Sequence, residues 1–296
     1  MDPRLSEIAE TLARDAASGA AGMHASILNG LLSMPEQDLV TIPAPEWEDF
    51  AVAIHRAKPS IAPVFNVANT IMLMTAQGAG GPASLRKALS EALEREKGSG
   101  MRIAEHSARL IKGRCFMTTS YSATVAQVLS ALAKDREIRI TVAESTPGGE
   151  GRQFAKVLAA QGMETEVIYD STVFARMGHL DGAIVGADSV TASGLVNKVG
   201  TRSLAEAAGA YELKAYAVCG WSKICPVVLS DLSTSTKTLG DRLTEHVQVF
   251  ESSPLELFSS IITDQGGLTS ADLRRELKVR EVAQAWYSRG ILQRTD

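Results

Sequence analysis

Several features that mark common protein classes are scarce or missing in this chain of 296 residues. Its three cysteines, Cys115, Cys219 and Cys225, have no metal-ligand spacing, so we expect buried, reduced thiols and no metal site. No apolar run reaches the roughly eighteen residues that a membrane helix needs, so we expect no membrane partner. Residues 1–19 are amphipathic and lack the apolar centre of a signal peptide, which predicts a cytoplasmic protein.

Other absences exclude classes of function. The net charge of −4 offers no basic surface, so we expect no nucleic acid as a partner. The glycine-rich stretch Gly78–Pro82 is not followed by the Gly-Lys-Ser/Thr of a phosphate-binding loop, and we interpret it as a linker between helices. No G-x-G-x-x-G follows the first predicted strand, which argues against a dinucleotide-dependent dehydrogenase. Five scattered histidines suggest no Ser-His-Asp arrangement.

The pattern that is present changes near residue 113. Over residues 1–112 apolar side chains recur at helical spacing, as at Leu5, Ile8 and Leu12, which predicts an N-terminal helical domain. Over residues 113–296 strands alternate with helices, which predicts an α/β domain with a doubly wound parallel sheet. The predicted strands are Cys115–Thr119, Ile138–Ala143, Glu166–Tyr169, Ala183–Gly186 and Ala215–Cys219, with a later one near Val247–Phe250. The predicted helices are Ala123–Ala133, Glu150–Ala160, Thr172–His179, Arg202–Ala208 and a capped helix from Ser270.

One stretch, residues 181–208, concentrates the chemistry. Asp188 follows a short buried strand, at the sheet edge where ligands bind in open α/β folds. Asn197 and Lys198 come next, and Thr201 is a candidate N-cap for the following helix. An acid, an amide, an ammonium group and a helix N-terminus within a few residues favour an anionic, hydroxyl-bearing ligand such as a sugar phosphate.

Two other loops supply further candidates. Ser120 and Ser122 follow the first strand, where their hydroxyls could hold a phosphate, cap the next helix, or do both. After the second strand, the turn at residues 144–152 exposes backbone N–H groups and ends at Arg152, which could bind a ligand or be solvated. Asn66 could face the pocket or lie at a helix end or surface.

The string GADSVTASGLVNKVGTRSLAEAA, residues 186–208, resembles the signature of a known family. That family unites the alpha, beta and delta regulatory subunits of eukaryotic initiation factor 2B, archaeal ribose-1,5-bisphosphate isomerase and methylthioribose-1-phosphate isomerase. The resemblance extends through AESTPGGEGRQFAKVLAAQGMETEVIYDS and VFESSPLELFSSIITDQGGLTSADLRREL, and so covers most of the chain. It implies a Rossmann-like sheet domain, a homodimer or higher oligomer, and a translation initiation factor as a possible partner.

This chain departs from the isomerases at several positions. The resemblance places their catalytic Cys at Ser120, paired with the Asp that matches Asp188, and a phosphate-gripping Arg at Thr146. The Arg of their N-terminal Arg-Gly-Ala motif is also missing beside Gly19. These changes bring the chain closest to the alpha-subunit-like and archaeal members. Residues that match family positions include two candidate phosphate contacts, Arg152 and Lys223.

Two functions therefore stay open. The first is a regulatory protein that binds a phosphorylated sugar or nucleotide in the family cleft, and the missing Cys and Arg residues favour it. The second is an aldose-ketose isomerase of a sugar 1-phosphate, in which Asp188 acts with Ser120 in place of the Cys. Retention of Asp188 favours the second. Neither function needs a metal or a redox cofactor, so we expect none.

Overall fold

The computed structural model describes residues 1–15, 18–76, 81–229 and 234–293. The predicted linker Gly78–Pro82 therefore lies largely outside the described residues. The N-terminal region is helical, as predicted. Its last part, residues 81–110, forms two helices because Gly98, with φ of +73°, separates them. The helices are α1 (Pro3–Arg14), α2 (Ala20–Ser33), α3 (Glu36–Thr41), α4 (Ala44–Ala57), α5 (Ala62–Ala76), α6 (Gly81–Glu96) and α7 (Ser99–Leu110).

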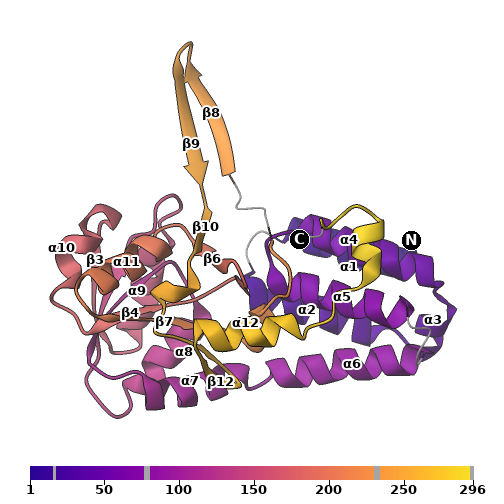
Figure 1. The fold of residues 1–296 in the computed structure, drawn as a ribbon, viewed down its shortest axis with the longest axis horizontal. Coiled ribbons are helices and arrows are strands. Elements are labelled where there is room, and N and C mark those ends of the chain that lie inside the picture. The colour runs from indigo at the N-terminus through magenta and orange to yellow at the C-terminus, as the bar shows by residue number, and fades with distance from the viewer. Residues whose placement is uncertain (16–17, 77–80, 230–233, 294–296) are drawn as a thin grey trace.

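A largely parallel sheet follows, in the order β12-β11-β7-β4-β1-β2-β3, with β12 antiparallel at one edge. Apolar residues of α7, α8 and α9 pack on one face and those of α10, α11 and α12 on the other, which confirms a doubly wound α/β fold (Figure 1). The strands are β1 (Cys115–Thr119), β2 (Arg139–Ala143), β3 (Glu164–Ile168), β4 (Gly182–Val185), β7 (Lys214–Val218), β11 (Ser260–Thr263) and β12 (Gly266–Leu268). The helices between and after them are α8 (Ala123–Leu132), α9 (Glu150–Ala160), η1 (Asp170–Thr172), α10 (Val173–Met177), α11 (Thr201–Ala210), η2 (Trp221–Lys223), η3 (Leu255–Leu257) and α12 (Ser270–Lys278).

A second, small sheet was not predicted. It consists of β5 (Ser189–Thr191), β6 (Gly194–Lys198) and β10 (Phe250–Ser253), paired antiparallel. Asn197 and Lys198 therefore lie on a strand, rather than in the loop that the sequence suggested. Strands β5 and β6 are too short to show a clear alternation of apolar and polar side chains, and β10, which pairs with β6, lies about fifty residues further along the chain. No local sequence pattern therefore predicts this sheet.

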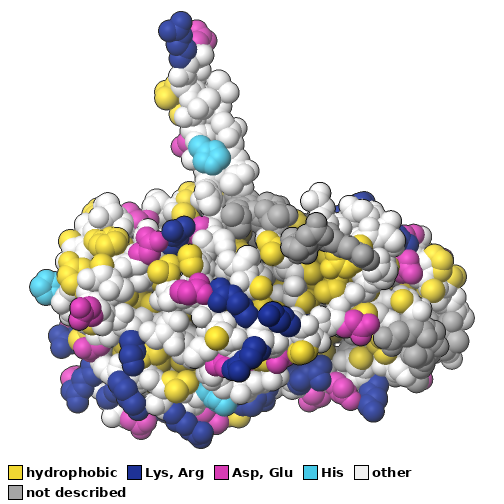
Figure 2. Space-filling view, in the orientation of Figure 1, with side chains coloured by type: hydrophobic (Ala, Val, Ile, Leu, Met, Phe, Trp, Pro, Cys, Tyr) yellow, Lys and Arg dark blue, Asp and Glu magenta, His cyan; other side chains and the backbone are white. Residues whose placement is uncertain are grey.

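A hairpin of β8 (Thr234–Gly240) and β9 (Leu243–Gln248) projects away from the body of the protein (Figures 1 and 2). All of β8 and most of β9 is exposed to solvent. The later segment Leu255–Ile262, which is apolar enough for core or interface, is core, since Leu255 and Ile262 are fully buried. Thr269 caps α12 in a reciprocal capping box with Asp272, which confirms the predicted cap.

The chain returns to the helical region at its C-terminal end. Trp286 in α13 (Gln284–Ser288) is fully buried among the N-terminal helices, with its ring 5.2 Å from that of Phe65. Its indole N–H donates to Asn69 Oδ1 at 3.1 Å. This segment fastens the two halves of the molecule together. Among the described residues, no helix has the length and apolar character to cross a membrane.

Candidate functional site

A cavity of about 830 Å³, here called the Asp188 cavity, lies between the helical region and the carboxyl ends of β1 and β4. Its walls come from α2, from the turn after α4, from the loops after β1 and β4, and from β6 and β10. Of the nine candidate residues, the structure brings seven together in this lining. They are Gly19, Ser120, Ser122, Asp188, Asn197, Lys198 and Lys223.

Asp188 is held just beyond β4 by a backbone hydrogen bond, in which its N–H donates to Val196 O at 2.9 Å. Burial raises the pKa of the Asp188 carboxyl above its ordinary value, and the charge of Lys223 opposes that rise. A carboxyl group with a raised pKa exchanges protons closer to neutral pH than an exposed aspartate does. The position is chemically suited to either a proton transfer or a hydrogen bond to a ligand hydroxyl.

The two lysines are buried and already hold protein partners. Lys198 Nζ donates to Glu150 Oε1 at 2.8 Å and to Pro147 O at 2.5 Å. Lys223 Nζ donates to Ala187 O. An ammonium group has three donors, so within the described part of the chain Lys198 has one donor and Lys223 two donors left for a ligand.

Hydroxyl groups and a strained turn shape the wall below β1. Ser120 adopts φ of +64°, and its backbone N–H donates to Ser145 Oγ at 2.6 Å. Ser122 caps α8 by accepting from Val125 N at 3.3 Å, which confirms the predicted cap. Gly186 passes directly beneath, because a Cβ there would lie 2.8 Å from Ser122 Oγ.

The N-terminus of α11 is not open to a ligand, contrary to the prediction. Gly200, with φ of +100°, is the N-cap, and Thr201 is the first helical residue. Glu251 Oε1 accepts from Gly200 N at 2.7 Å and from Arg202 N at 2.8 Å. The protein's own carboxylate therefore occupies the place where a phosphate would sit at this helix end. Glu251 lies on β10, about fifty residues after Gly200, so the sequence pattern around α11 gave no sign of this contact.

Two candidates lie outside the Asp188 cavity. Arg152 is exposed on α9, where it pairs with Glu144 at 2.6 Å and covers the ring of Tyr169. Asn66, on α5, is turned away from the Asp188 cavity and lines a second cavity instead. Its side-chain amide donates to Ser222 O at 2.7 Å and so connects the helical region to the loop after β7. The structure thus assigns both side chains to protein contacts.

The sequence analysis also missed several lining residues. Lys58, whose Nζ donates to Asp15 O at 2.6 Å, adds a third ammonium group. Three carboxylates, from Asp15, Glu150 and Asp188, balance the ammonium groups of Lys58, Lys198 and Lys223. Among the lining residues that the structure describes, none is arginine, histidine or cysteine. Glu150 opens the helix after the predicted glycine turn, and neither Lys58 nor Glu150 was identified from the sequence as a site residue.

A family model described as the initiation factor 2 subunit family, IF-2B, matches residues 37–270. The chain belongs to this family. The resemblance drawn from the sequence is thereby confirmed. The match includes the helices from α4 to α11 and the main sheet through β12, while the wall that α2 contributes to the Asp188 cavity precedes the matched residues.

Individual relatives differ in how much they share with the chain. An eIF-2B subunit 2-like protein of Pyrococcus horikoshii is 27% identical over 271 residues, covering 89% of this chain and 95% of the relative. The eIF2B beta subunit of Dictyostelium discoideum is 30% identical over 154 residues, or 51% of this chain and 40% of that longer protein.

Solved structures agree on the fold. An eIF-2B crystal structure from Pyrococcus horikoshii superposes with a TM-score of 0.77 at 25% identity, covering 94% of this chain and all of that one. The 5-methylthioribose 1-phosphate isomerase of the same organism has a TM-score of 0.67 at 18% identity, covering 93% and 88%. A tetrameric eIF2B-beta2-delta2 complex from C. thermophilum gives 0.69 at 21% identity, covering 91% of each chain. Factor subunits and an isomerase share this fold, so the fold alone does not choose between them.

Proposed function

We propose that the protein is a regulatory binding protein that holds a sugar or nucleoside carrying one phosphate in the Asp188 cavity. The observation that carries this proposal is the balanced charge of the lining, with three ammonium groups facing three carboxylates. A bisphosphate would bring about four negative charges into a cavity without a single arginine among its described lining residues. One phosphate can be met by the unused donors of Lys198 and Lys223, with sugar hydroxyls bonded by Asp188 and Asn197.

The cavity size supports the same class of ligand. A volume of about 830 Å³ lies within the range of small-molecule and cofactor sites. The hydroxyl groups of Ser120 and Ser122 and the ring of Tyr121 offer hydrogen bonds and one flat surface. This combination fits a ribose or a nucleoside better than an apolar ligand.

The chemistry needed for turnover is weak here. Cys219 is the cysteine whose charge would interact with Asp188, but it is fully buried and absent from the cavity lining. Burial raises the pKa of the Cys219 thiol to about 12, so it offers no thiolate at neutral pH. A serine hydroxyl at Ser120 is a far poorer proton carrier than a thiol.

One observation favours the second candidate, an aldose-ketose isomerase of a sugar 1-phosphate. The raised pKa of Asp188 is what a general acid or base needs, and Ser120 lies in the same cavity. In that reaction Asp188 would assist ring opening, and Ser120 or a water would carry the proton between adjacent carbons.

The test is calorimetric titration with AMP, ribose 5-phosphate, ribose 1,5-bisphosphate and methylthioribose 1-phosphate, followed by NMR of each mixture over time. Tight binding of a monophosphate that stays unchanged supports the regulatory function. Formation of a ketose product, lost in Asp188→Asn, would establish the isomerase instead. Lys198→Met should abolish binding, while Lys156→Met, an exposed change on the same helix as Glu150, should leave it unaltered.

We also propose that the protein acts as a homodimer or larger assembly in the cytoplasm, with a translation initiation factor as a partner. The family supports this, since one similar structure is a tetrameric factor complex. Analytical ultracentrifugation with and without the bound monophosphate tests the assembly directly, because a monomer at micromolar concentration under both conditions would contradict it.

A further inference from the structure

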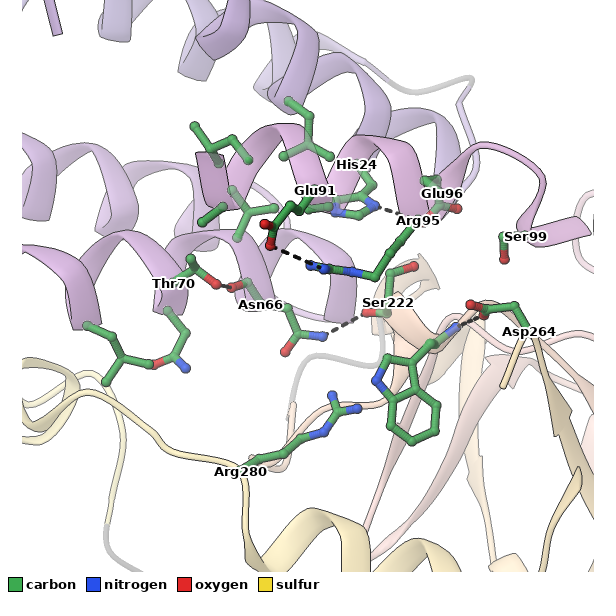
Figure 3. Close-up of a pocket in the computed structure, with 18 of the residues that line it drawn as sticks. His24, Asn66, Thr70, Glu91, Arg95, Glu96, Ser99, Ser222, Asp264 and Arg280 are labelled. Carbon is green, nitrogen blue, oxygen red and sulfur yellow. Dashed lines mark hydrogen bonds and ion pairs between the residues drawn. The ribbon is translucent and has the colours of Figure 1, made fainter. Parts of the chain in front are cut away.

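A second cavity, of about 540 Å³, lies on the other side of two elements that also line the first (Figure 3). In α2, Ala20 and Met23 face the Asp188 cavity, while His24 and Leu28 face the second one. In η2, Lys223 faces the first cavity and Trp221 the second. We call the second one the Glu96 cavity, and nothing in the proposed function uses it.

One wall of the Glu96 cavity is apolar. It is formed by side chains that three helices, α2, α5 and α6, present to the same space: Leu28, Val67, Leu73, Ala88, Leu89 and Ala92. Across from it lies the indole of Trp221, whose outer face is covered by the Arg280 guanidinium at 4.7 Å. The cavity therefore offers a branched aliphatic or aromatic group a surface to pack on.

The remaining lining is acidic. Four carboxylates line the space, from Glu91, Glu96, Asp264 and Glu281, against two guanidinium groups. Arg280 is committed to the Trp221 ring, to Ile224 O at 2.6 Å and to Glu276, which lies at 3.6 Å. The other, Arg95, is 60% exposed at the rim, 3.8 Å from Glu91. Outside the lining, Arg102 lies 3.7 Å from Asp264, and the charge of Lys223 acts on Glu96. Glu96 and Asp264 are nevertheless largely buried at one end of the cavity, where the ammonium group of a ligand could pair with both.

The polar end of the cavity has an unused hydrogen-bonding group. Ser99 is only 5% exposed and lines the cavity, and its hydroxyl forms no hydrogen bond to a described residue. Figure 3 shows it across from Asp264 and beside Glu96. Glu96 Oε2 lies 3.1 Å from His24 Nδ1, while Glu96 Oε1 and the hydroxyls of Ser99 and Ser222 lie around Gly220. A ligand that donates hydrogen bonds can therefore reach the Ser99 hydroxyl and Glu96 together.

We propose that the Glu96 cavity binds a small organic cation, a primary amine on a branched aliphatic body. Its ammonium group donates to Glu96 and Ser99, with Asp264 nearby, and its aliphatic body packs on the apolar wall formed by α2, α5 and α6. The carboxylates and the Ser99 hydroxyl match the ammonium end of such a molecule, and the apolar wall matches its aliphatic end. An anion of the same shape would meet the four carboxylates instead.

The experiment uses 3-methylbutylamine as the probe, with 3-methylbutan-1-ol and 4-methylpentanoate as neutral and anionic analogues. Binding is followed by NMR of the Trp221 indole N–H, without any phosphorylated ligand present. We expect saturable binding of the amine at least tenfold tighter than that of the alcohol, and none of the carboxylate. Equal binding of amine and alcohol, or no saturable shift of the Trp221 signal, would overturn the proposal.

Two variants locate the binding. Glu96→Gln should weaken the amine at least tenfold, whereas Glu94→Gln, an exposed change two residues away on α6, should not. Gly220→Ala covers the case in which Glu96→Gln disturbs folding. Its methyl group would lie 3.5 Å from Ser99 Oγ and 3.8 Å from Glu96 Oε1, ordinary contact distances, yet would occupy the space for the ammonium group. Amine binding unchanged in folded Gly220→Ala would contradict the assigned position.

Discussion

The two cavities share α2 and η2 but differ in what lines them. The Asp188 cavity lies at strand ends, where turns supply hydroxyls, glycines and lysines held by backbone carbonyls. The Glu96 cavity lies largely between helices, which present a row of leucines on one side and carboxylates on another. One junction between a helical region and a sheet therefore carries two cavities for which we propose opposite ligands, a phosphate in one and a cation in the other.

Lys223 connects them electrostatically. Its charge favours the ionised form of Asp188 in one cavity and of Glu96 in the other. The net effects differ, because burial dominates at Asp188 and raises its pKa. At Glu96 burial also acts to raise the pKa, but the hydrogen bonds from His24 and Ser222 and the charge of Lys223 bring it below its ordinary value. The same ammonium group thus acts on one acid whose pKa is raised and on one whose pKa is lowered.

Trp286→Ala should have the largest effect, because it separates the C-terminal segment that carries Arg280 and Glu281 from the helices. Removing a fully buried indole should lower the free energy of unfolding by about 3–5 kcal/mol. Urea denaturation measures this, and Ser288→Ala on the same helix is the exposed control. Amine binding should be lost under conditions where the variant is still folded and still binds the monophosphate. Loss of amine binding and monophosphate binding together would show that both cavities depend equally on the C-terminal segment, contrary to this prediction.

Lys223→Met should affect both cavities at once. Loss of a buried charged donor should weaken monophosphate binding by about 1.5–3 kcal/mol, or roughly ten- to a hundredfold. The pKa values of Asp188 and Glu96 should both rise, as followed by carboxyl NMR. Lys214→Met, exposed at the start of β7, is the control. A rise at only one carboxyl would break the proposed connection.

The pH dependence of stability should have opposite signs for the two acids. The raised pKa of Asp188 means that the folded state holds its proton more tightly, so this contribution is present below about pH 4 and is lost as pH rises. The lowered pKa of Glu96 gives a contribution present above about pH 4.3 and lost as pH falls. As pH rises from about 4 to 7, Asp188→Asn should therefore gain thermal stability relative to wild type. Glu96→Gln should lose thermal stability relative to wild type as pH rises from about 3 to 5 and then keep that difference up to about pH 7. Melting curves of the three proteins between about pH 3 and 7 decide this.

The smallest expected effect is coupling between the two ligands. An amine at Glu96 neutralises a carboxylate that competes for Lys223, so the monophosphate should bind a few-fold more tightly in its presence. By reciprocity the monophosphate should tighten the amine by the same factor. Calorimetric titrations in both orders measure it, with Lys223→Met as the variant in which the factor should fall to one.

The sequence predicted the fold well where the signal is local. The predicted strands of the main sheet appear within a few residues of their expected bounds, because apolar runs between glycine-rich turns identify buried parallel strands. Strands β5 and β6 escaped prediction because each is short, and the strand predicted near Val247–Phe250 falls across the end of β9 and the start of β10, whose pairing with β6 joins residues far apart in the chain. Trp286 likewise gives no local sign that it packs beside Phe65.

The candidate site was predictable to a similar degree. Asp188 and Lys198 follow from the position of strand ends and from the family pattern, and both line the Asp188 cavity. Arg152 matched the family pattern too, yet Glu144 and Tyr169 hold it on the surface. The Glu96 cavity was not predicted, although one of its lining residues, Asn66, was a candidate for the family cleft. Its residues come from six separate segments, and no spacing rule brings Ser99 and Asp264 together.

The projecting hairpin of β8 and β9 is connected directly to the wall of the Asp188 cavity. A two-stranded hairpin has little stability of its own, and this one is exposed on nearly all sides. Only Val249 separates β9 from β10, and Val249 and Phe250 both lie in the cavity wall. The hairpin is therefore joined directly to the cavity wall, so a partner bound to the hairpin would lie one residue along the chain from the proposed ligand site.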